Sequence, residues 1–404
     1  MSMKFDIFFS ICQTPVDGYM PSERVMLQNF FDQVRHADAL GFGTAWVAET
    51  HLSCQVQKRN PGAVIPHFEG EIGLNTDILQ VAHKIFAMTS RIHVGSAIRN
   101  IQCNGGPIAH AEAVRTFLSI HNLDGSEKRK LELGFAAGRF PFSNTPYGIK
   151  PRNAWEQVAW PIVRGKIFQE AVEIFLRFIK GEVFSSKQVT DQVLQRSDFR
   201  TDEHWQQTLD AYGENQNQIP LPSRWEFDQV GVIPLEAPLE NLWLTIGAHD
   251  AATQDFANTF YPCGVFNLSF TPGPQIEATH QRLMKTFHPD GGPWKRTYMP
   301  RTVLVFIEDG PGLSTAQKDQ KARETATKAT ENYWCAIEGT IDPARIQQGV
   351  DNALVGSPET VLEQVKSRFH PEDRLMLWFD FNNHDNAGVK ANMTCFMERV
   401  AAQL

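Results

Sequence analysis

The fold is decided by the alternation within residues 4–48, KFDIFFSICQTPVDGYMPSERVMLQNFFDQVRHADALGFGTAWVA. The first part, Lys4–Ile11, is apolar and aromatic, which predicts a strand. Ser22 can then cap a helix, because apolar residues recur behind it at helical spacing. Gly41 ends that helix, and Thr44–Ala48 predicts the next strand. A strand, a helix and a second strand in this order are typical of a parallel βαβ unit.

The same alternation continues to the end of the chain. Further strands are predicted at Ile92–Ile98, Lys130–Ala136, Leu242–Ile246, Gly264–Ser269, Met299–Ile307 and Leu375–Phe381. Helices are predicted from Asn75 or Thr76 to Thr89 and over 108–121, 155–180, 250–260, a stretch ending near 287, 314–337, 357–369 and a last stretch to 404. Eight strands separated by helices predict an α/β fold, namely a (β/α)8 TIM barrel. A doubly wound open sheet is the alternative architecture.

One segment, at about 181–240, interrupts the pattern because it is polar, rich in glutamine and punctuated by prolines. It lies between the fourth helix and the fifth strand, so we interpret it as an insertion in a single barrel domain spanning 1–404. Such a segment can cover an active site, or it can be a surface excursion with no role. Under the first alternative, Ser185–Arg224 should be mobile without ligand and close over the site, since few apolar contacts would hold it down.

Composition excludes several classes of protein. The 38 Lys and Arg against 46 Asp and Glu give a net charge of -8, and the basic residues are scattered, so no nucleic-acid partner is expected. The chain starts without a charged-then-apolar leader and has no run of about 18 apolar residues, so we expect a cytoplasmic protein without a membrane partner. The six cysteines form no Cys-x-x-Cys pair, which favours free thiols and no metal site.

In a barrel, functional groups gather where the strands end. The second predicted strand runs into Glu49-Thr50-His51. Glu49 and His51 are two residues apart and could act as an acid–base pair on one face. The alternative is that His51 only orders the loop, with Glu49 bonded to backbone amides.

The turn after the fifth strand, Gly247 to Asp250, is a second candidate. Gly247 gives the backbone freedom, and the free amides at a helix start suit a phosphate group. Asp250, however, can cap the same helix with its own carboxylate. A phosphate site and an ordinary helix cap are therefore both open for this turn.

The chain resembles the bacterial-luciferase-like flavin monooxygenases in blocks that occur in the same order. These blocks are Lys4-Phe5, Gly41–His51, Val94–Ile98, Pro107 with Glu112 and Val114, Leu133–Phe135 with Gly138, Tyr147-Gly148, Arg164–Glu170, Pro238 with Leu242–Gly247, and Val355–Val361. The polar insertion also stands where the family has one.

The resemblance implies a barrel that binds reduced FMN supplied by a separate flavin reductase. In the family, molecular oxygen adds to the flavin C4a carbon, and the peroxyflavin oxygenates a small organic substrate. We also expect a homodimer. Some relatives use a deazaflavin and transfer only hydride, and a few bind flavin without turnover. A monooxygenase, a deazaflavin-dependent dehydrogenase and a non-enzymatic flavin-binding protein are therefore the three hypotheses.

Residue by residue, the resemblance places the flavin ring at Ala97-Ile98, where the family commonly has a non-proline cis peptide. It implies cofactor contacts from Gly138 and Tyr147 and a phosphate site at His249, Asp250 and Ala251, completed by Arg139 or Arg164. The sequence departs from the family at four positions: Thr50 stands where the catalytic base is a histidine, Ala136 and Ala137 replace a cysteine and an arginine, and Asp250 replaces a serine. His51 is then the surviving ionisable group of that motif.

Overall fold

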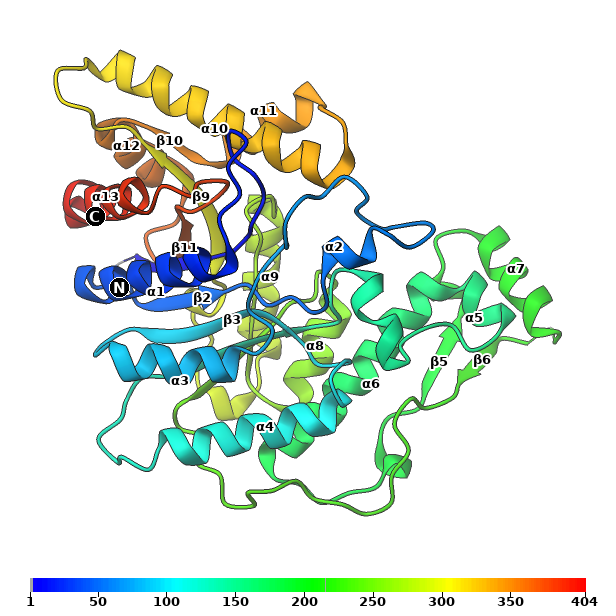
Figure 1. Cartoon of the computed structure of the whole chain (residues 1–404). Helices are drawn as coiled ribbons and strands as arrows, with labels where there is room; N and C mark the ends of the chain where they lie inside the picture. Colours follow the sequence, from blue (N-terminus) through cyan, green and yellow to red (C-terminus); the bar gives the residue numbers. More distant parts are fainter. Residues whose placement is uncertain (1–2, 215) are drawn as a thin grey trace.

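Within residues 3–214 and 216–404, which the computed structural model describes, nine parallel strands form one sheet (Figure 1). The strands are β1 (Lys4–Phe9), β2 (Thr44–Val47), β3 (His93–Asn100), β4 (Leu131–Ala136), β7 (Leu242–Ile246), β8 (Cys263–Val265), β9 (Arg301–Ile307), β10 (Leu354–Gly356) and β11 (Arg374–Trp378). Their order is β10-β9-β11-β1-β2-β3-β4-β7-β8. The α/β class is confirmed.

The strand order decides between the two predicted architectures. From β1 to β8 neighbouring strands follow chain order, whereas a doubly wound sheet reverses its order at a switch point. Asn267, just after β8, forms an isolated parallel bridge with Arg301 at the start of β9, so the chain beyond one edge strand meets β9. The doubly wound alternative is therefore wrong.

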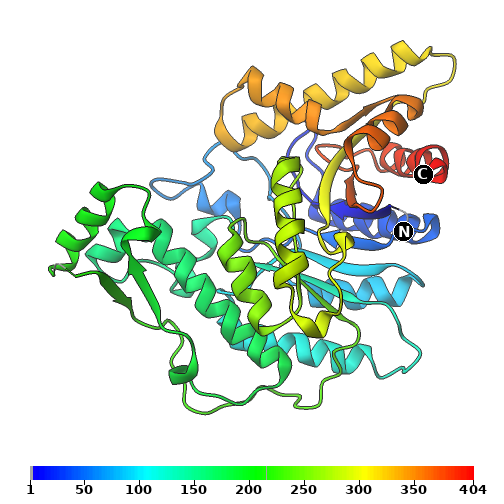
Figure 2. The same ribbon diagram turned by 180° about the vertical axis from the view of Figure 1, so that it is seen from behind.

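Most of the helices lie around this sheet on its outer side, and a few extend away from it (Figures 1 and 2). They are α1 (Glu23–Leu40), α2 (Cys54–Gln57), α3 (Ile78–Met88), α4 (Gly106–His121), α5 (Ala154–Val158), α6 (Trp160–Lys180), α7 (Asp202–Tyr212), α8 (Ala251–Phe260), α9 (Gly273–Thr286), α10 (Thr315–Glu338), α11 (Pro343–Asn352), α12 (Pro358–Arg368) and α13 (Asn386–Cys395). Local signals set their ends: Ser22 caps α1, and Gly41 closes it in the left-handed conformation.

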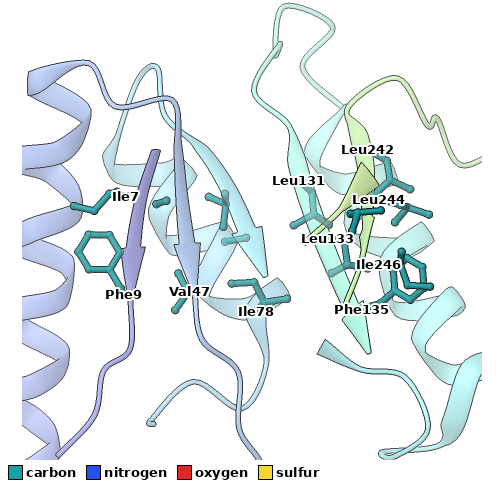
Figure 3. Close-up of a cluster of buried hydrophobic side chains, with 14 of the residues drawn as sticks. Ile7, Phe9, Val47, Ile78, Leu131, Leu133, Phe135, Leu242, Leu244 and Ile246 are labelled. Carbon is teal, nitrogen blue, oxygen red and sulfur yellow. The ribbon is translucent and has the colours of Figure 1, made fainter. Parts of the chain in front are cut away.

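The main core lies between the strands and these helices. Alternate residues of β1, β2, β4 and β7 pack there and are almost fully buried (Figure 3). The labelled side chains in that view are Ile7, Phe9, Val47, Ile78, Leu131, Leu133, Phe135, Leu242, Leu244 and Ile246. Because successive side chains of a strand point to opposite faces, the residues between them face the inner side of the sheet.

The segment between α6 and β7 carries structure of its own. Strands β5 (Gln192–Gln195) and β6 (Gln218–Leu221) pair antiparallel, and α7 connects them. Apolar side chains from this segment, from α5 and α6 and from the chain just before and between these helices form a second buried cluster: Ile149, Trp155, Ala159, Val163, Ile167, Leu194, Phe199, Trp205, Leu209, Ile219 and Leu221. The expectation that few apolar contacts hold the segment down is therefore wrong, because its scattered apolar residues converge only after folding. Residue 215 lies outside the described residues.

Other differences from the sequence prediction concern short elements. Strand β10 and helices α2, α7 and α11 were not predicted; β10 and α2 are only three and four residues long, too short for a periodic pattern. Strand β8 ends at Val265 rather than at Ser269, and β11 ends at Trp378 rather than at Phe381. The predicted 155–180 helix is two helices, α5 and α6.

Candidate active site

The amino end of the sheet's inner face is closed by a buried ionic cluster. Arg374 on β11 donates to Asp6 on β1 over 2.6 Å and to both oxygens of Glu132 on β4 over 2.7 Å. Thr44 on β2 accepts from Arg374 and donates to Glu132. Burial disfavours the charged guanidinium, yet Asp6 and Glu132 hold the pKa of Arg374 above its usual range. This cluster ties the first and last strands together and leaves the opposite end for chemistry.

Above this cluster the inner face is apolar. Phe8, Trp46, Phe266 and Met376 form one buried group. The Trp46 indole donates to Asp6 over 2.7 Å, which fixes its ring over the ionic cluster. Gly95 is required beside it, because a Cβ there would lie 2.5 Å from the Trp46 ring. A flat apolar layer of this kind can support a flat apolar ring.

Small residues follow at the carboxyl end of the same face. Ala48 and Ala97 pack on the apolar layer, and a Cβ on Gly247 would lie 2.5 Å from Ile98 and 3.2 Å from Ala136. The peptide bond between Ala97 and Ile98 is cis, as the family resemblance implies. The side chains at this end are thus small on β2, β3, β4 and β7.

Glu49 and His51 are in contact at the end of β2. His51 Nε2 lies 3.3 Å from Glu49 Oε1, and Asn104 Nδ2 lies 2.9 Å from His51 Nδ1. With this orientation of the amide, Asn104 donates to Nδ1, so the ring proton sits on Nε2 and points at Glu49. Both ring nitrogens are therefore engaged, and the His51 side chain is only 8% exposed.

Glu49 connects this pair to a second histidine. Its side chain is fully buried and accepts from the amide of Ile78 over 3.1 Å and from Arg99 over 3.5 Å. Arg99 donates from Nε to His110 Nδ1 over 2.8 Å. His110 must then carry its proton on Nε2, which donates to the Cys103 carbonyl over 2.9 Å. Burial, then the charge of Arg99, lowers the pKa of His110 to about 3, so it stays neutral.

Thr50, at the family's usual base position, makes a main-chain contact. Its amide donates to the Asn75 carbonyl over 2.9 Å. Its methyl group lies 2.8 Å from where a Cβ on Gly73 would stand, so the loop after β2 packs closely on it. A threonine hydroxyl can hydrogen-bond, but it cannot act as a general base near neutral pH.

The three predicted site residues after β4 lie in different surroundings. Gly138 has φ of 75°, and a Cβ there would lie 2.3 Å from the Asn100 amide, so this turn requires glycine. Arg139 is exposed, stacks on Phe140 at 5.3 Å, and its Nη1 lies 3.4 Å from the hydroxyl of Tyr333 on α10. Tyr147 is 38% exposed in a short 3-10 turn. Arg139 thus faces α10.

At the turn after β7, Asp250 acts as the N-cap of α8. Its carboxylate accepts from the amide of Thr253 over 2.7 Å, and the Thr253 hydroxyl accepts from Gln169 on α6 over 3.0 Å. Arg164 lies on α6, five residues before Gln169, and forms no ion pair within the described part of the chain. His249 and Ala251 are exposed beside the cap.

The structure therefore brings some predicted residues together and separates others. Glu49, Thr50 and His51 lie at the end of β2, next to the β3 end that holds Ala97 and Ile98. Arg139 contacts Tyr333 on α10. Arg164 instead lies on α6, the helix whose Gln169 side chain donates to Thr253 on α8. Sequence reasoning missed Asn104, His110 and Asp77, which accepts from Arg99 over 3.0 Å. Arg99 was recognisable only as a polar residue at a strand end, because its partners come from other elements of the fold.

The residues present fit a flavin. The apolar layer and the small side chains around Ala97-Ile98 suit a flat ring, and the α8 start offers amides that helices leave unpaired. The Asp250 carboxylate already occupies one of those amides, which disfavours a phosphate at that point. No group of three or more His, Cys, Asp or Glu side chains in residues 3–214 and 216–404 could hold a metal ion.

A parallel sheet wrapped by helices, with an apolar inner face and polar groups at the strand ends, defines a barrel-like α/β protein. Residues 3–187 match the family model of the luciferase-like monooxygenases, which confirms the resemblance to the bacterial-luciferase-like family. The uncharacterized protein y4vJ of Sinorhizobium fredii (strain NBRC 101917 / NGR234) is 27% identical over 183 residues, 45% of this chain and 42% of that protein. The matched stretch is thus less than half of that relative's length.

Solved structures of similar fold cover almost the whole chain. Monooxygenase RslO1 from Streptomyces bottropensis is 16% identical over 99% of both chains, with a TM-score of 0.66. The oxygenating constituent of 3,6-diketocamphane monooxygenase from Pseudomonas putida, solved with FMN, is 15% identical over 100% of this chain and 99% of that chain, with a TM-score of 0.61. An F420-dependent secondary alcohol dehydrogenase, solved with an F420–acetone adduct, is 12% identical over the same shares, with a TM-score of 0.52. At these identities the likeness shows the fold.

No helix in the described ranges combines the length and the apolar character that crossing a bilayer needs.

Proposed function

We propose that the protein is a flavin-dependent monooxygenase that uses reduced FMN and molecular oxygen to oxygenate a small organic substrate. The observation that carries the proposal is the inner-face site: an apolar layer ending in small side chains beside the cis Ala97-Ile98 peptide. The sequence match over residues 3–187 supports it. Under this proposal the whole chain is one (β/α)8 barrel domain, closed at the Asn267–Arg301 bridge, with residues 181–240 as its insertion.

When bound, reduced FMN would supply the reaction with molecular oxygen. The chain's own residues bind and orient it. Ala97 and Ile98 would contact the ring, and the start of α8 with His249 and Ala251 would hold the phosphate. Arg164 is the cation we assign to that phosphate, since it has no ion-pair partner among the described residues and lies on the helix that contacts α8.

Arg139, Gly138 and Tyr147 belong to the rim of this site in our proposal. Gly138 lets the chain turn close to Asn100, and Arg139 reaches toward Tyr333. Because the contacts of Arg139 lead to α10, we assign it to the substrate side and not to the phosphate.

His51 would manage a proton beside the ring, with Glu49 as its partner and Thr50 as packing. A proton can be taken up at Nδ1 only if Asn104 turns its amide, because that nitrogen already accepts from Asn104. The carboxylate of Glu49 would then stabilise the doubly protonated ring from the Nε2 side.

A deazaflavin-dependent dehydrogenase is the second candidate, because the same fold occurs in an F420-dependent alcohol dehydrogenase. It would transfer hydride and need no oxygen. A flavin-binding protein without turnover is the third. A separate flavin reductase, a homodimer and a cytoplasmic location complete the proposal for the monooxygenase.

The test is to mix the purified protein with chemically reduced FMN and then with oxygen. A long-lived absorbance typical of a C4a-peroxyflavin is expected. Rapid reoxidation at the rate of free flavin, together with tight binding of a deazaflavin, would favour the dehydrogenase. Flavin binding without any oxygenated product, over a panel of small organic substrates, would favour the third candidate.

A further inference from the structure

Asp380 lies on the inner side of the sheet, just beyond the end of β11. Met376 and Trp378 belong to the apolar inner group, whereas Leu375, Leu377 and Phe379 pack in the outer core. Alternation therefore puts Asp380 on the inner side, above Trp378. Its carboxyl stands at the same end of the sheet as the proposed flavin ring.

Asp380 is half-buried, and no cation pairs with its carboxyl within the described residues. Its Oδ1 atom is inaccessible and forms no hydrogen bond within the described residues. The Trp378 indole N–H and the amides of Ser10 and Ile11 lie close to the carboxyl and favour its charged form. Burial is the larger effect and raises the pKa of Asp380 to about 7.

Several other titratable groups lie on the elements next to Asp380. Burial, and more weakly the charge of Asp380, raise the pKa of the Cys12 thiol on the β1 side. On the β9 side, Glu308 accepts from the Gly310 amide and Asp309 is paired with Lys318 and Arg399.

His384 follows in the chain and bonds the Thr14 carbonyl over 2.7 Å, and burial lowers its pKa. Tyr333 on α10 contacts Phe381, the residue after Asp380, ring to ring.

We propose that Asp380 is a proton-exchanging residue on the substrate side of the site. It donates its carboxylic proton to an oxygen or nitrogen of the substrate, becomes a carboxylate, and regains the proton from solvent. The inference rests on the proposed function, since the proton has a recipient only if a substrate binds at the carboxyl end of the inner face. A residue in this position that merely shaped the turn after β1 would not impose its own titration on the reaction rate.

Asp309 provides a matched control. It stands two residues beyond the end of β9, as Asp380 stands two beyond the end of β11, but it is paired with Lys318 and Arg399. Burial opposes ionisation of Asp309, yet these hydrogen-bonded partners hold its pKa below its usual range. Asp380→Asn and Asp309→Asn make the same chemical change, and Asn keeps an oxygen that can accept from the amides of Ser10 and Ile11.

The first measurement uses the protein without flavin. Infrared difference spectra between about pH 5 and about pH 9 should show a protonated-carboxyl band that disappears around pH 7 in the native chain. The part of the band due to Asp380 should be lost in Asp380→Asn and kept in Asp309→Asn, whereas any signal from Asp6 and Glu170, whose pKa values burial also raises, should stay in both variants. A band of full size in Asp380→Asn would overturn the proposal, whatever the protein's reaction.

The second measurement uses the flavin-loaded protein. The rate of its reaction should change with an inflection near pH 7 in the native chain and in Asp309→Asn, and the inflection should vanish in Asp380→Asn, with a loss of roughly 10²-fold at the optimum. An unchanged pH profile in Asp380→Asn, with flavin still bound, would overturn the Asp380 role alone. A native chain that binds no flavin would instead remove the proposed function, and the infrared band would still report the titration.

Discussion

His51 shows how much a single residue's role depends on its neighbours. Glu49 takes one ring nitrogen and Asn104 the other, so the imidazole is held in one tautomer and one orientation. Such a ring can position a loop, or it can accept a proton when one partner moves. Measurements on a His51 variant can decide between these two roles.

Replacing His51 with Gln should lower turnover by roughly 10²-fold while reduced-flavin affinity changes little, if His51 exchanges a proton. Steady-state kinetics and flavin titration measure the two quantities. His36→Gln is the control, because His36 also makes two hydrogen bonds, to Lys390 and Thr394 between α1 and α13. Equal losses of stability and activity in His51→Gln would show a structural role, and full activity would remove His51 from the mechanism.

At this scale the sequence allowed some residues to be predicted and hid others. The caps Ser22 and Asp250 were predictable because their signals are local. The pairing of Glu49 with His51 followed from their spacing. Asn104 and Asp380 could not be predicted as partners or as a buried acid, because burial and contact with a distant loop are tertiary properties that one strand's sequence does not contain.

Among the elements, the start of α8 is where two features of the site oppose each other. The helix offers amides to an anion, and Asp250 puts its own negative charge there. Serine is as good an N-cap as aspartate, so the conflict can be removed without unfolding the helix.

Asp250→Ser should therefore tighten FMN binding by about two- to five-fold, the effect expected for one charge at a helix terminus. Fluorescence titration with FMN measures the affinity. Asp342→Ser, which changes the N-cap of α11 in the same way, should leave the affinity unchanged. A large loss of affinity in Asp250→Ser would mean that the carboxylate maintains the turn, and that the phosphate lies elsewhere.

The segment between α6 and β7 is packed more firmly than its composition suggests. Its composition suggested a loosely held cover, but Leu194 and Ile219 are fully buried and sit on the paired strands β5 and β6. Six apolar residues spread through a polar stretch give no periodic signal, yet they meet Val163 and Ile167 of α6 once folded.

Amides of β5, β6 and α7 should accordingly exchange with solvent far more slowly than those of an exposed loop. Hydrogen exchange followed by mass spectrometry measures this. Leu194→Ala should destabilise the segment by about 2–5 kcal/mol and speed its exchange, whereas Leu123→Ala, at an 83% exposed residue, should do neither. If the amides of 192–212 exchanged as fast as those around Leu123 in the native chain, the hypothesis of a mobile cover would be correct after all.

On the scale of the whole molecule, the alternation of strands and helices was sufficient to predict the α/β class and a sheet in near-sequential order. It was not sufficient to predict the strands near the edge of the sheet. Strand β10 and the helix before it were missed, and β9 pairs with both β10 and β11. What joins the two ends of the chain is the ionic cluster, in which Arg374 meets Asp6 across 368 residues of sequence.

That cluster leads to the last prediction. Arg374→Met would leave Asp6 and Glu132 buried without a counter-charge, a change that costs about 3–5 kcal/mol in comparable buried pairs. Burial already raises the pKa of Asp6, and the pKa of Glu132, which Arg374 holds low, would then rise as well. The stability that the two carboxyls allow would therefore be complete below about pH 4 and lost as pH rises through the raised values. The urea midpoint of Arg374→Met should therefore fall further below the native midpoint at pH 8 than at pH 4. Adding Asp6→Asn and Glu132→Gln should remove that pH dependence and restore much of the midpoint, because no uncompensated charge remains. A constant deficit at every pH, unrelieved by the two added substitutions, would mean that Arg374 acts through its packing against Trp46 and not through its charge.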